Sequence, residues 1–436
     1  MKRKTTLLTG VAITLILLLL IPVLQSKLHI FKETPLKGAV VKAAESYFSV
    51  TGWFSGEYQE AEEKYLNDNF GLRNFFIRLN NQLAYNLFNK AKANGVIIGK
   101  DKFLFEENYL KAYSGLDYIG YDSIEKRMSR LKKVQDYFES QNKTFLLVFA
   151  AGKGTFYPEY FPDDWKKFEK DRKTNFNTYV SLAEQKGINF IDFNTYFKSN
   201  KESSPFPLYP KHGIHWSHYG MCLVVDSLFN YFERVNGTEL ADIVWNEVEI
   251  SEAKKSDYDI ADGMNLLYPP KKEKLAYPNY QIIVKDGDSK PSVIVIADSF
   301  YWGMFNDGIP AAVFSDQHFW FYNKQIYPDS YTKPIEVGDI DLETELKNHD
   351  IFIIMGTEAT LPALGWGFIE NVYYLIKNGS PTEILFRKKV DELIAYIRTD
   401  KNWMRAIEKK ARESNISIDS MLVIDAKWQV KLKMEK

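Results

Sequence analysis

Cysteine is almost absent from this chain of 436 residues, in which Cys222 is the only one. A single cysteine cannot form a disulfide within the chain, so the fold depends on its apolar core even in an oxidising compartment. Net charge is nearly absent as well, because 56 Lys and Arg residues balance 57 Asp and Glu residues to give a formal charge of −1. Without an overall basic field to bind a phosphate backbone, nucleic acid is not an expected partner.

The composition also lacks the biases of disordered and fibrous proteins, with 45% hydrophobic and 26% charged residues. Such values are typical of globular proteins and exclude disorder, collagen and coiled coil. The length predicts two or three domains, at roughly 150 residues for each. Aromatic residues make up 15% of the chain. Most of them are expected in the core, although surface Trp and Tyr side chains would suit stacking on sugars.

Only one long hydrophobic run is present, and it lies at the N-terminus. The first four residues, Met1-Lys2-Arg3-Lys4, make a basic start, and an uncharged apolar run extends from Leu7 to about Leu24. This run exceeds the apolar region of a cleaved signal peptide, and no convincing cleavage site follows it, so residues 1–27 are predicted to be an uncleaved membrane anchor. The positive-inside rule keeps the basic end in the cytoplasm, which predicts that everything after about residue 27 lies outside it.

Two local elements are expected after the anchor. Residues 28–95 are predicted to be a helical lead-in, because Ile77, Leu83 and Leu87 are spaced roughly for one face of a helix. Residues 96–105 are predicted to form a hairpin, because a Gly-Lys-Asp-Lys turn separates two runs that are rich in strand-forming residues.

The region 96–379 alternates between amphipathic helices and short apolar runs. The expected helices cover 124–139, 175–185 and 217–235, and the expected buried strands cover 144–150, 188–193, 293–297 and 351–355. Continuous apolar strands separated by amphipathic helices are typical of a mainly parallel sheet with both faces covered. The sequence therefore predicts a three-layer α/β/α domain over 96–379, followed by a helical C-terminal extension over 380–436.

A candidate nucleophile lies directly after one of these strands. Asp298 and Ser299 follow the expected strand 293–297, and open α/β sheets place their sites at the carboxyl ends of strands. If residues 301–305 begin a helix, free backbone N–H groups beside Ser299 could stabilise an oxyanion. The Gly-x-Ser-x-Gly pattern of a nucleophile elbow is missing, and a serine after a strand is more often a cap or turn residue.

Histidine is scarce, yet three of the six histidines fall within residues 211–220: His212, His215 and His218. A general base for a serine must titrate near neutrality, and His215 is the predicted base, with Trp216 as a wall that limits its motion. A metal site and a purely structural loop are the alternatives. Gly213 disfavours the helix that would align His212 with His215, and no nearby Cys or carboxylate completes a ligand set. A metal site is therefore disfavoured here, and acyl transfer by a serine and a histidine needs no metal and no organic cofactor.

Five motifs follow one another along the chain: Phe70-Gly71-Leu72-Arg73, residues 99–105, Ala150-Ala151-Gly152-Lys153 with Tyr157-Pro158, His215-Trp216 with Gly220, and Asp298-Ser299-Phe300. In this order they resemble the motifs of the SGNH-hydrolase-like alginate O-acetyltransferases of the AlgX and AlgJ type, including the DHHW proteins. The resemblance covers most of the chain after the anchor, and the histidine precedes the serine as it does in that family.

The resemblance implies that Ser299 accepts the acyl group and that His215 is its general base. One departure concerns the acid, because the family pattern Asp-x-His-Trp has an aspartate where this chain has Gly213. Loss of that acid can lower the rate of a triad enzyme by about 10⁴. We expect another carboxylate to substitute, or the activity to be reduced. The candidate substitutes are Asp298 and Glu358, and His212 could instead form a hydrogen bond in the region of the aspartate.

Substrate-binding residues are expected around this pair of side chains. Aromatic side chains near Ser299 could line a sugar groove, although core packing would explain them equally well. The residues assigned to substrate binding are Lys153, His212, Trp216, Tyr301, Trp302, Trp320 and Tyr322.

Three functions agree with these features. The first is an O-acetyltransferase in the periplasm that acetylates hydroxyls of an exported polysaccharide through an acetyl-Ser299 intermediate. The second is an acetylesterase that uses the same residues with water as acceptor, and the third is a non-catalytic glycan-binding scaffold. The resemblance further implies that a membrane-bound O-acyltransferase partner supplies the acetyl group.

Overall fold

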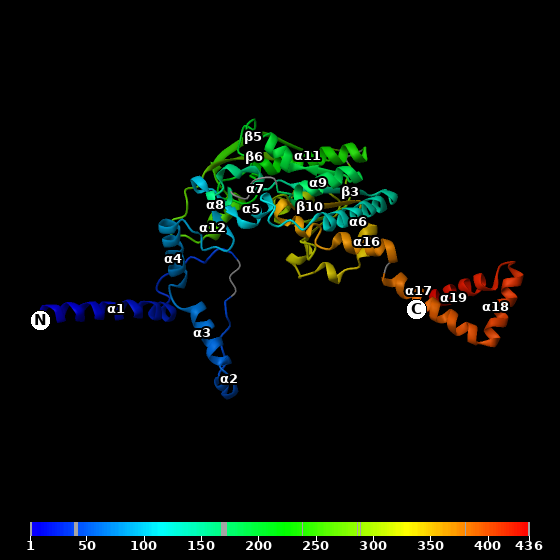
Figure 1. Cartoon of the computed structure of the whole chain (residues 1–436), viewed down its shortest axis with the longest axis horizontal. Helices are drawn as coiled ribbons and strands as arrows, with labels where there is room; N and C mark the ends of the chain where they lie inside the picture. The colour runs from blue at the N-terminus through cyan, green and yellow to red at the C-terminus, as the bar shows by residue number, and fades with distance from the viewer. Residues whose placement is uncertain are drawn as a thin grey trace.

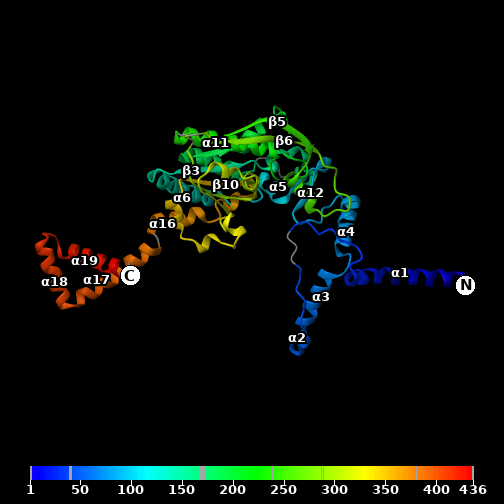
Figure 2. The same cartoon turned by 180° about the vertical axis from the view of Figure 1, so that it is seen from behind.

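The computed structural model describes residues 2–38, 42–166, 172–237, 239–285, 287, 289–379 and 381–434. Met1, the first residue of the predicted basic start, and Ser380, the first residue of the predicted C-terminal extension, lie outside the described residues. A central α/β body carries the N-terminal helices on one side and the C-terminal helices on the other (Figures 1 and 2).

The N-terminal apolar run forms α1 (Lys2–Leu28). Among the described residues it is the one helix that is long and apolar enough to cross a membrane, over Leu8–Leu28. Aliphatic side chains such as Leu17 and Leu19 are more than half exposed, and burying them in a bilayer would stabilise the helix. A membrane anchor and a signal sequence both agree with this helix.

The lead-in contains three helices, which follow a non-helical stretch: α2 (Val50–Ser55), α3 (Glu57–Asn69) and α4 (Arg73–Phe88). The expected apolar face of α4 does not pack inward, because Leu83 and Leu87 are exposed whereas Asn81 and Gln82 are buried. The Asn81 amide donates to the Met264 carbonyl over 2.9 Å. Specific hydrogen bonds therefore dock this helix, and helical periodicity could not predict them.

The central sheet has six strands in the order β4-β3-β10-β7-β8-β9. All neighbours are parallel except β8 and β9, which pair antiparallel at one edge. Its strands are β3 (Thr144–Ala150), β4 (Phe190–Asp192), β7 (Val293–Ala297), β8 (Gln317–Phe321), β9 (Gln325–Tyr327) and β10 (Ile351–Thr357). The four predicted strands are all present, and β8 and β9 extend the sheet beyond them.

Side chains alternate between two cores on opposite faces of the sheet. Leu147 of β3 and Ile354 of β10 belong to one core, whereas their neighbours Val148 and Ile353 belong to the other. One face is covered by α6 (Tyr121–Ser140), α9 (Asn175–Lys186) and α16 (Phe368–Asn378), and the other by α10 (Phe193–Ser199), α11 (His218–Asn236), α13 (Trp302–Asn306) and α14 (Ile309–Val313). The predicted three-layer α/β/α architecture is confirmed.

Two hairpins lie outside the central sheet. The predicted one is β1 (Val96–Ile98) with β2 (Leu104–Glu106). The other, β5 (Asp242–Glu252) with β6 (Lys274–Ile283), was not predicted. The segment that joins β5 to β6 contains a short 3₁₀ helix, η3 (Lys255–Tyr258), and α12 (Asp259–Gly263).

Shorter helices complete the body: α5 (Glu107–Tyr113), α7 (Lys153–Phe156), α8 (Asp163–Lys166) and α15 (Leu342–Asn348). The C-terminal region is helical, as predicted, and forms α17 (Pro381–Thr399), α18 (Lys401–Glu413) and α19 (Ile418–Met434). Ile397, Ile407 and Leu422, one from each of these helices, share a small apolar core. This core is separate from the two cores of the sheet.

Candidate active site

The loop after β7 positions Ser299 at the carboxyl end of the sheet. β7 ends at Ala297, Asp298 caps the turn, and Ser299 begins a single 3₁₀ turn, η4 (Ser299–Tyr301). The Asp298 carboxylate accepts the Phe300 N–H over 3.0 Å. This bond fixes the turn and leaves the Ser299 hydroxyl partly accessible.

His215 lies between Ser299 and an aspartate. The distance from Ser299 Oγ to His215 Nε2 is 3.0 Å, within the roughly 2.6–3.2 Å over which a base can accept the proton of a nucleophile. On the other side of the ring, His215 Nδ1 is 2.7 Å from Asp259 Oδ2. Asp259 Oδ1 also accepts the Ile214 N–H over 3.0 Å. The carboxylate thus holds both the imidazole and the backbone next to it, in the arrangement of a Ser-His-Asp triad.

Asp259 determines the protonation of His215. Burial acts to lower the pKa of the imidazole, but the hydrogen bond and the charge of Asp259, together with the charges of Asp298 and Glu106, outweigh it and raise the pKa above its ordinary value. A proton on Nδ1, bonded to Asp259, leaves the Nε2 lone pair facing the serine hydroxyl. The ring is therefore poised to accept the proton of Ser299.

The two carboxylates predicted to replace the missing aspartate bond elsewhere, so that prediction is wrong. One oxygen of Asp298 binds Phe300 N–H, and the other accepts from Thr357 N–H over 2.8 Å and from the Thr360 hydroxyl over 3.0 Å. Asp298 therefore joins the ends of β7 and β10 and acts on His215 only through its charge.

Glu358 is buried beside α7 and accepts the Thr155 N–H over 3.0 Å as well as the Thr155 hydroxyl. Burial raises its pKa to about 7. Its side chain also fills the space next to Gly152, where an added Cβ would collide with it. Glu358 thus stabilises the loop after β3 and is not the acid partner of His215.

Lys153, assigned to substrate binding, is fully buried beneath the histidine loop. Its ammonium donates to the Gly213 carbonyl over 2.6 Å and to the Lys211 carbonyl over 2.9 Å. Burial lowers its pKa to about 7, although the charges of Asp259, Glu273 and Glu106 oppose this shift. Lys153 cannot reach a ligand in this position and instead supports the backbone that carries His215.

The three clustered histidines have different surroundings. His212 is buried and stacks edge-on against Tyr258, and burial lowers its pKa to about 4. His218 Nδ1 lies 3.5 Å from a carboxylate oxygen of Asp307. Because only His215 faces Ser299, the three rings do not converge on one metal site, and His212 neither replaces the aspartate nor faces the substrate pocket.

A pocket of about 190 Å³ opens beside Ser299. Aromatic rings form its walls, and Lys255 and Asp307 form an ion pair of 3.0 Å at its polar side. It is lined by His215, Trp216, His218, Met221, Lys255, Ser256, Ser299, Phe300, Trp302, Gly303, Asn306 and Asp307. Trp216 and Trp302, two of the predicted substrate-binding residues, lie in this wall.

Two other predicted aromatic residues point away from the pocket. Trp320 is fully buried in the core on the α16 side of the sheet and packs against Phe368. Tyr301 is buried in the opposite core, where it packs edge-on against Phe319. Successive residues of β8 face opposite sides of the sheet, so Phe319 and Trp320 cannot both face one groove. Trp320 and Tyr301 are structural residues.

Tyr322 is the predicted substrate residue that lies nearest to the chemistry. Its hydroxyl lies close enough to the side chain and the backbone of Ser299 for both to affect its pKa. Burial and the charge of Asp298 raise its pKa to about 12, so the hydroxyl stays protonated and can donate. The expected row of free helix N–H groups is absent here, because Asp298 takes those of Phe300 and Tyr301. Among the described residues, Ser299 N–H and the Tyr322 hydroxyl are the candidate donors for an oxyanion.

A substitution at Gly213 tests whether this position has room for the aspartate of the family pattern. An added Cβ there would lie 2.4 Å from the Ser256 carbonyl oxygen and 2.8 Å from backbone carbon of Asp257. Restoring the family pattern with Gly213→Asp should therefore displace the loop, lower the melting temperature and reduce esterase turnover. Gly263→Asp, made on α12 where a Cβ meets nothing within 4 Å, is the matched control. A higher rate in Gly213→Asp would contradict this account.

Comparison with known proteins agrees with the site. Residues 96–258 match the family described as ALGX, SGNH hydrolase-like domain, acetyltransferase AlgX. That match includes His215 but ends before Asp259 and Ser299, so the structure supplies the rest of the triad. No curated protein matches this chain.

Three solved structures align with the chain. They are the O-acetyltransferase domain of Pseudomonas putida AlgJ (14% identity, 64% of this chain and 98% of that one, TM-score 0.43), Pseudomonas aeruginosa AlgX (13%, 63% and 67%, TM-score 0.41) and Bacillus cereus PatB1 with a sulfonyl adduct (13%, 63% and 99%, TM-score 0.42). The similarity to the SGNH hydrolase-like domain of the acetyltransferase AlgX thus covers residues 96–258, which is less than half of the chain.

Proposed function

We propose that this protein is an O-acetyltransferase that moves an acetyl group through Ser299 onto a hydroxyl of a polysaccharide outside the cytoplasm. The observation that carries the proposal is the hydrogen-bonded series from Asp259 through His215 to Ser299, with distances of 2.7 and 3.0 Å. Asp259 orients the His215 ring, and His215 can take the proton of the Ser299 hydroxyl during nucleophilic acyl transfer.

In the first half-reaction, Ser299 Oγ attacks the carbonyl carbon of an acetyl ester while His215 Nε2 takes the hydroxyl proton. The Asp259 carboxylate stabilises the imidazolium that forms. His215 then returns the proton to the leaving oxygen or sulfur, the bond between that atom and the acetyl carbon breaks, and acetyl-Ser299 remains.

In the second half-reaction, a sugar hydroxyl attacks the acetyl carbon as His215 removes the hydroxyl proton. The bond from Ser299 Oγ to the acetyl carbon breaks, and the serine recovers a proton from His215. In both halves the negative charge on the carbonyl oxygen would be stabilised by Ser299 N–H and the Tyr322 hydroxyl.

The acceptor class rests on the pocket and on the family. Trp302, the partly exposed ring of the pocket wall, is suited to stacking against a sugar ring, whereas Trp216 and Phe300 back the wall from the core. AlgX-type relatives are named for acetyl transfer, which supports a transferase over an acetylesterase. The scaffold alternative depended on a missing acid, and Asp259 occupies that place beside His215.

Intact mass tests the transfer. After incubation with an activated acetyl ester, the protein should gain one acetyl group, and an added oligosaccharide acceptor should remove that group faster than buffer alone. Release to water at the same rate with or without any acceptor would favour the esterase. Absence of acetylated protein and of hydrolysis would favour the scaffold.

The site of action follows from α1. We place the domain after the anchor outside the cytoplasm, because the basic residues precede the apolar segment Leu8–Leu28. Activated acetyl is made inside the cell, so a membrane-bound O-acyltransferase partner would deliver it across the membrane. The α1 helix would keep Ser299 near that partner.

This topology predicts a protease result. Protease added outside intact spheroplasts should digest the chain beyond about residue 27, because the membrane protects only what lies inside. A cytoplasmic protein measured in the same sample serves as the control for intact cells. Complete protection of the domain would place it in the cytoplasm and contradict the polysaccharide acceptor.

A further inference from the structure

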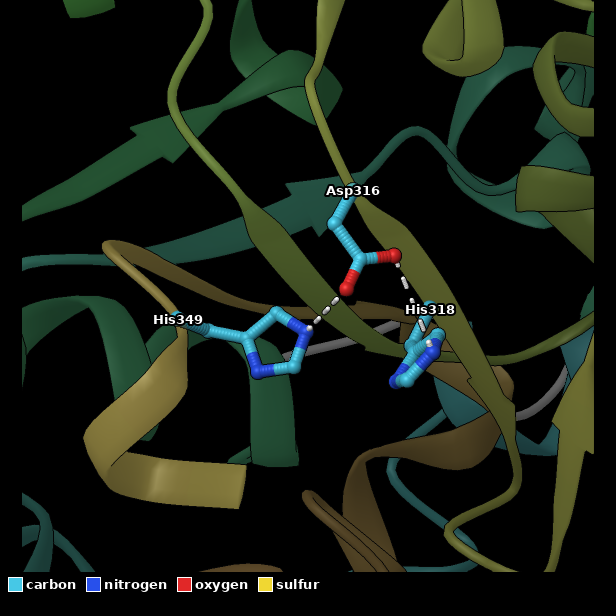
Figure 3. Close-up of side chains that lie close together, drawn as sticks. All are labelled: Asp316, His318 and His349. Atoms are coloured by element: carbon cyan, nitrogen blue, oxygen red, sulfur yellow. Dashed lines mark ion pairs between the residues drawn. The ribbon is translucent and has the colours of Figure 1, made fainter. Parts of the chain in front are cut away.

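A second group of chemically reactive side chains lies at the opposite edge of the sheet from Ser299. Asp316 directly precedes β8, His318 is its second residue, and His349 lies between α15 and β10. Figure 3 shows the three side chains directed toward one another from these separate segments. Because the strands are parallel, this amino-terminal edge is remote from the carboxyl-terminal edge that carries the triad.

The distances within this group leave a gap among the three side chains. Each Asp316 carboxylate oxygen faces one ring: Oδ2 is 3.6 Å from His349 Nε2, and Oδ1 is 3.8 Å from His318 Nε2. Both separations are too long for hydrogen bonds. One ligand atom from each of the three residues lies within 4.8 Å of the other two. The three side chains are thus close together, but Asp316 forms no hydrogen bond with either histidine.

Glu345, on α15, orients both rings. Its carbonyl oxygen lies 2.9 Å from His349 Nδ1, and its carboxylate lies 3.3 Å from His318 Nδ1. Both contacts place the ring proton on Nδ1 and leave the Nε2 lone pair of each ring facing Asp316. A histidine that ligates a metal is commonly oriented in this way, with its other nitrogen bonded to a carbonyl or a carboxylate.

His349 gives an independent sign of a missing partner. The residue is only 2% exposed, and its Nε2 has no hydrogen-bond partner among the described residues. An unsatisfied buried polar atom costs about 1–3 kcal/mol. This nitrogen is aimed into the gap beside Asp316 (Figure 3).

We propose that Asp316, His318 and His349 bind a divalent transition metal, with Zn²⁺ as the expected ion. Two imidazole nitrogens and one carboxylate favour zinc over magnesium or calcium. Tetrahedral zinc with bonds of roughly 2.0–2.1 Å separates its ligand atoms by about 3.3 Å. The Asp316 oxygens lie 3.6 and 3.8 Å from the two Nε2 atoms, and one ligand atom from each residue lies within 4.8 Å of the others, so the side chains would move inward by up to about 1.5 Å to bind the ion.

Asp329 supplies a candidate ligand for the fourth position of the metal. Asp329 Oδ2 lies 4.0 Å from His318 Nε2, so either this carboxylate or water would complete the tetrahedron. The ion would join β8 to the segment before β10. In the sheet, β8 and β10 are separated by β7. Its effect would therefore be on stability, and the acyl-transfer chemistry at the other edge would proceed without it.

Zinc binding to the full-length chain tests the proposal. Protein stripped with a chelator and returned to Zn²⁺ should retain one equivalent after buffer exchange, measured by elemental analysis, and its melting temperature should rise with Zn²⁺ concentration. Co²⁺ in place of zinc should give the visible absorption of a tetrahedral site. Asp316→Asn and His349→Gln should weaken zinc binding by about 10-fold or more.

Controls separate this site from the active-site histidines. Asp316 is largely exposed, so Asp316→Asn should fold normally without metal and isolates the loss of a ligand. His29→Ala removes a histidine outside the group and should keep one equivalent, and so should His215→Ala. No retained zinc in the unaltered chain, or equal retention in Asp316→Asn and His349→Gln, would overturn the proposal. Zinc lost only in His215→Ala would overturn it too.

Discussion

Ser299→Ala should abolish acetyl capture while the protein remains folded. The variant removes the nucleophilic atom, Ser299 Oγ, which lies 3.0 Å from His215 Nε2. Its stability should fall by at most about 1 kcal/mol, since the hydroxyl contributes one hydrogen bond. The readouts are intact mass after incubation with an activated acetyl ester, hydrolysis of a chromogenic acetyl ester, and the acetyl content of polysaccharide from complemented cells.

The companion variant His215→Ala should lose nearly as much activity, because a serine hydroxyl without its base is a poor nucleophile. The double variant should be scarcely worse than either single one, since members of a catalytic unit act non-additively. Ser203→Ala, an exposed serine after α10, is the matched control. Normal polysaccharide acetylation in cells that carry Ser299→Ala at unchanged protein levels would leave the scaffold alternative standing.

The sheet could be predicted because its strands carry a local signal. Residues 144–150 and 293–297 are unbroken apolar runs, and both are strands with these bounds. A strand buried on both faces needs apolar residues at every position, so such runs identify it without tertiary information. The β5–β6 hairpin has mixed polarity and is partly exposed along both strands, which explains why periodicity did not reveal it.

The acid of the triad could not be predicted, because it lies in the connection between the two strands of this unpredicted hairpin. Asp259 lies 44 residues after His215 and begins α12 within the connection between β5 and β6. The backbone of Ser256 and Asp257, in that same connection, fills the space beside Gly213. The position that would carry the family aspartate thus has no room for a side chain. No local sequence pattern joins Asp259 to His215, and only the path of the hairpin brings them together.

Motif resemblance and aromaticity were weak guides to substrate contacts. Lys153 is a predicted substrate residue from a motif that resembles the family's, yet the ammonium is buried and bonded to the carbonyls of Gly213 and Lys211. Trp320 was assigned on its ring, yet strand alternation directs it into the core on the opposite face. The type of a residue shows what its side chain can bind. Its position in a strand, helix or loop determines which side of the sheet the side chain faces.

Asp259→Asn should lower acyl-transfer turnover by about 10⁴ with little change in the fold. An asparagine oxygen can still accept the Ile214 N–H, which Asp259 Oδ1 accepts over 3.0 Å. The amide NH₂ would then face His215 Nδ1 and donate to it. That bond places the remaining ring proton on Nε2, so the nitrogen that faces Ser299 can no longer accept the serine proton.

The pH profile distinguishes this electrostatic role from a loss of structure. Turnover requires neutral His215, so the rate should rise with pH through the pKa of the imidazole, which lies above its ordinary value in the unaltered protein. Asp259→Asn removes the bond and the charge that raise this pKa most, while burial still lowers it, so the midpoint should move to lower pH. Asp262→Asn makes the same change on an exposed residue of α12, which is 3.9 Å from Lys37, and should leave both midpoint and rate unchanged. A midpoint that stays in place in Asp259→Asn, or rises, would show that another carboxylate controls His215.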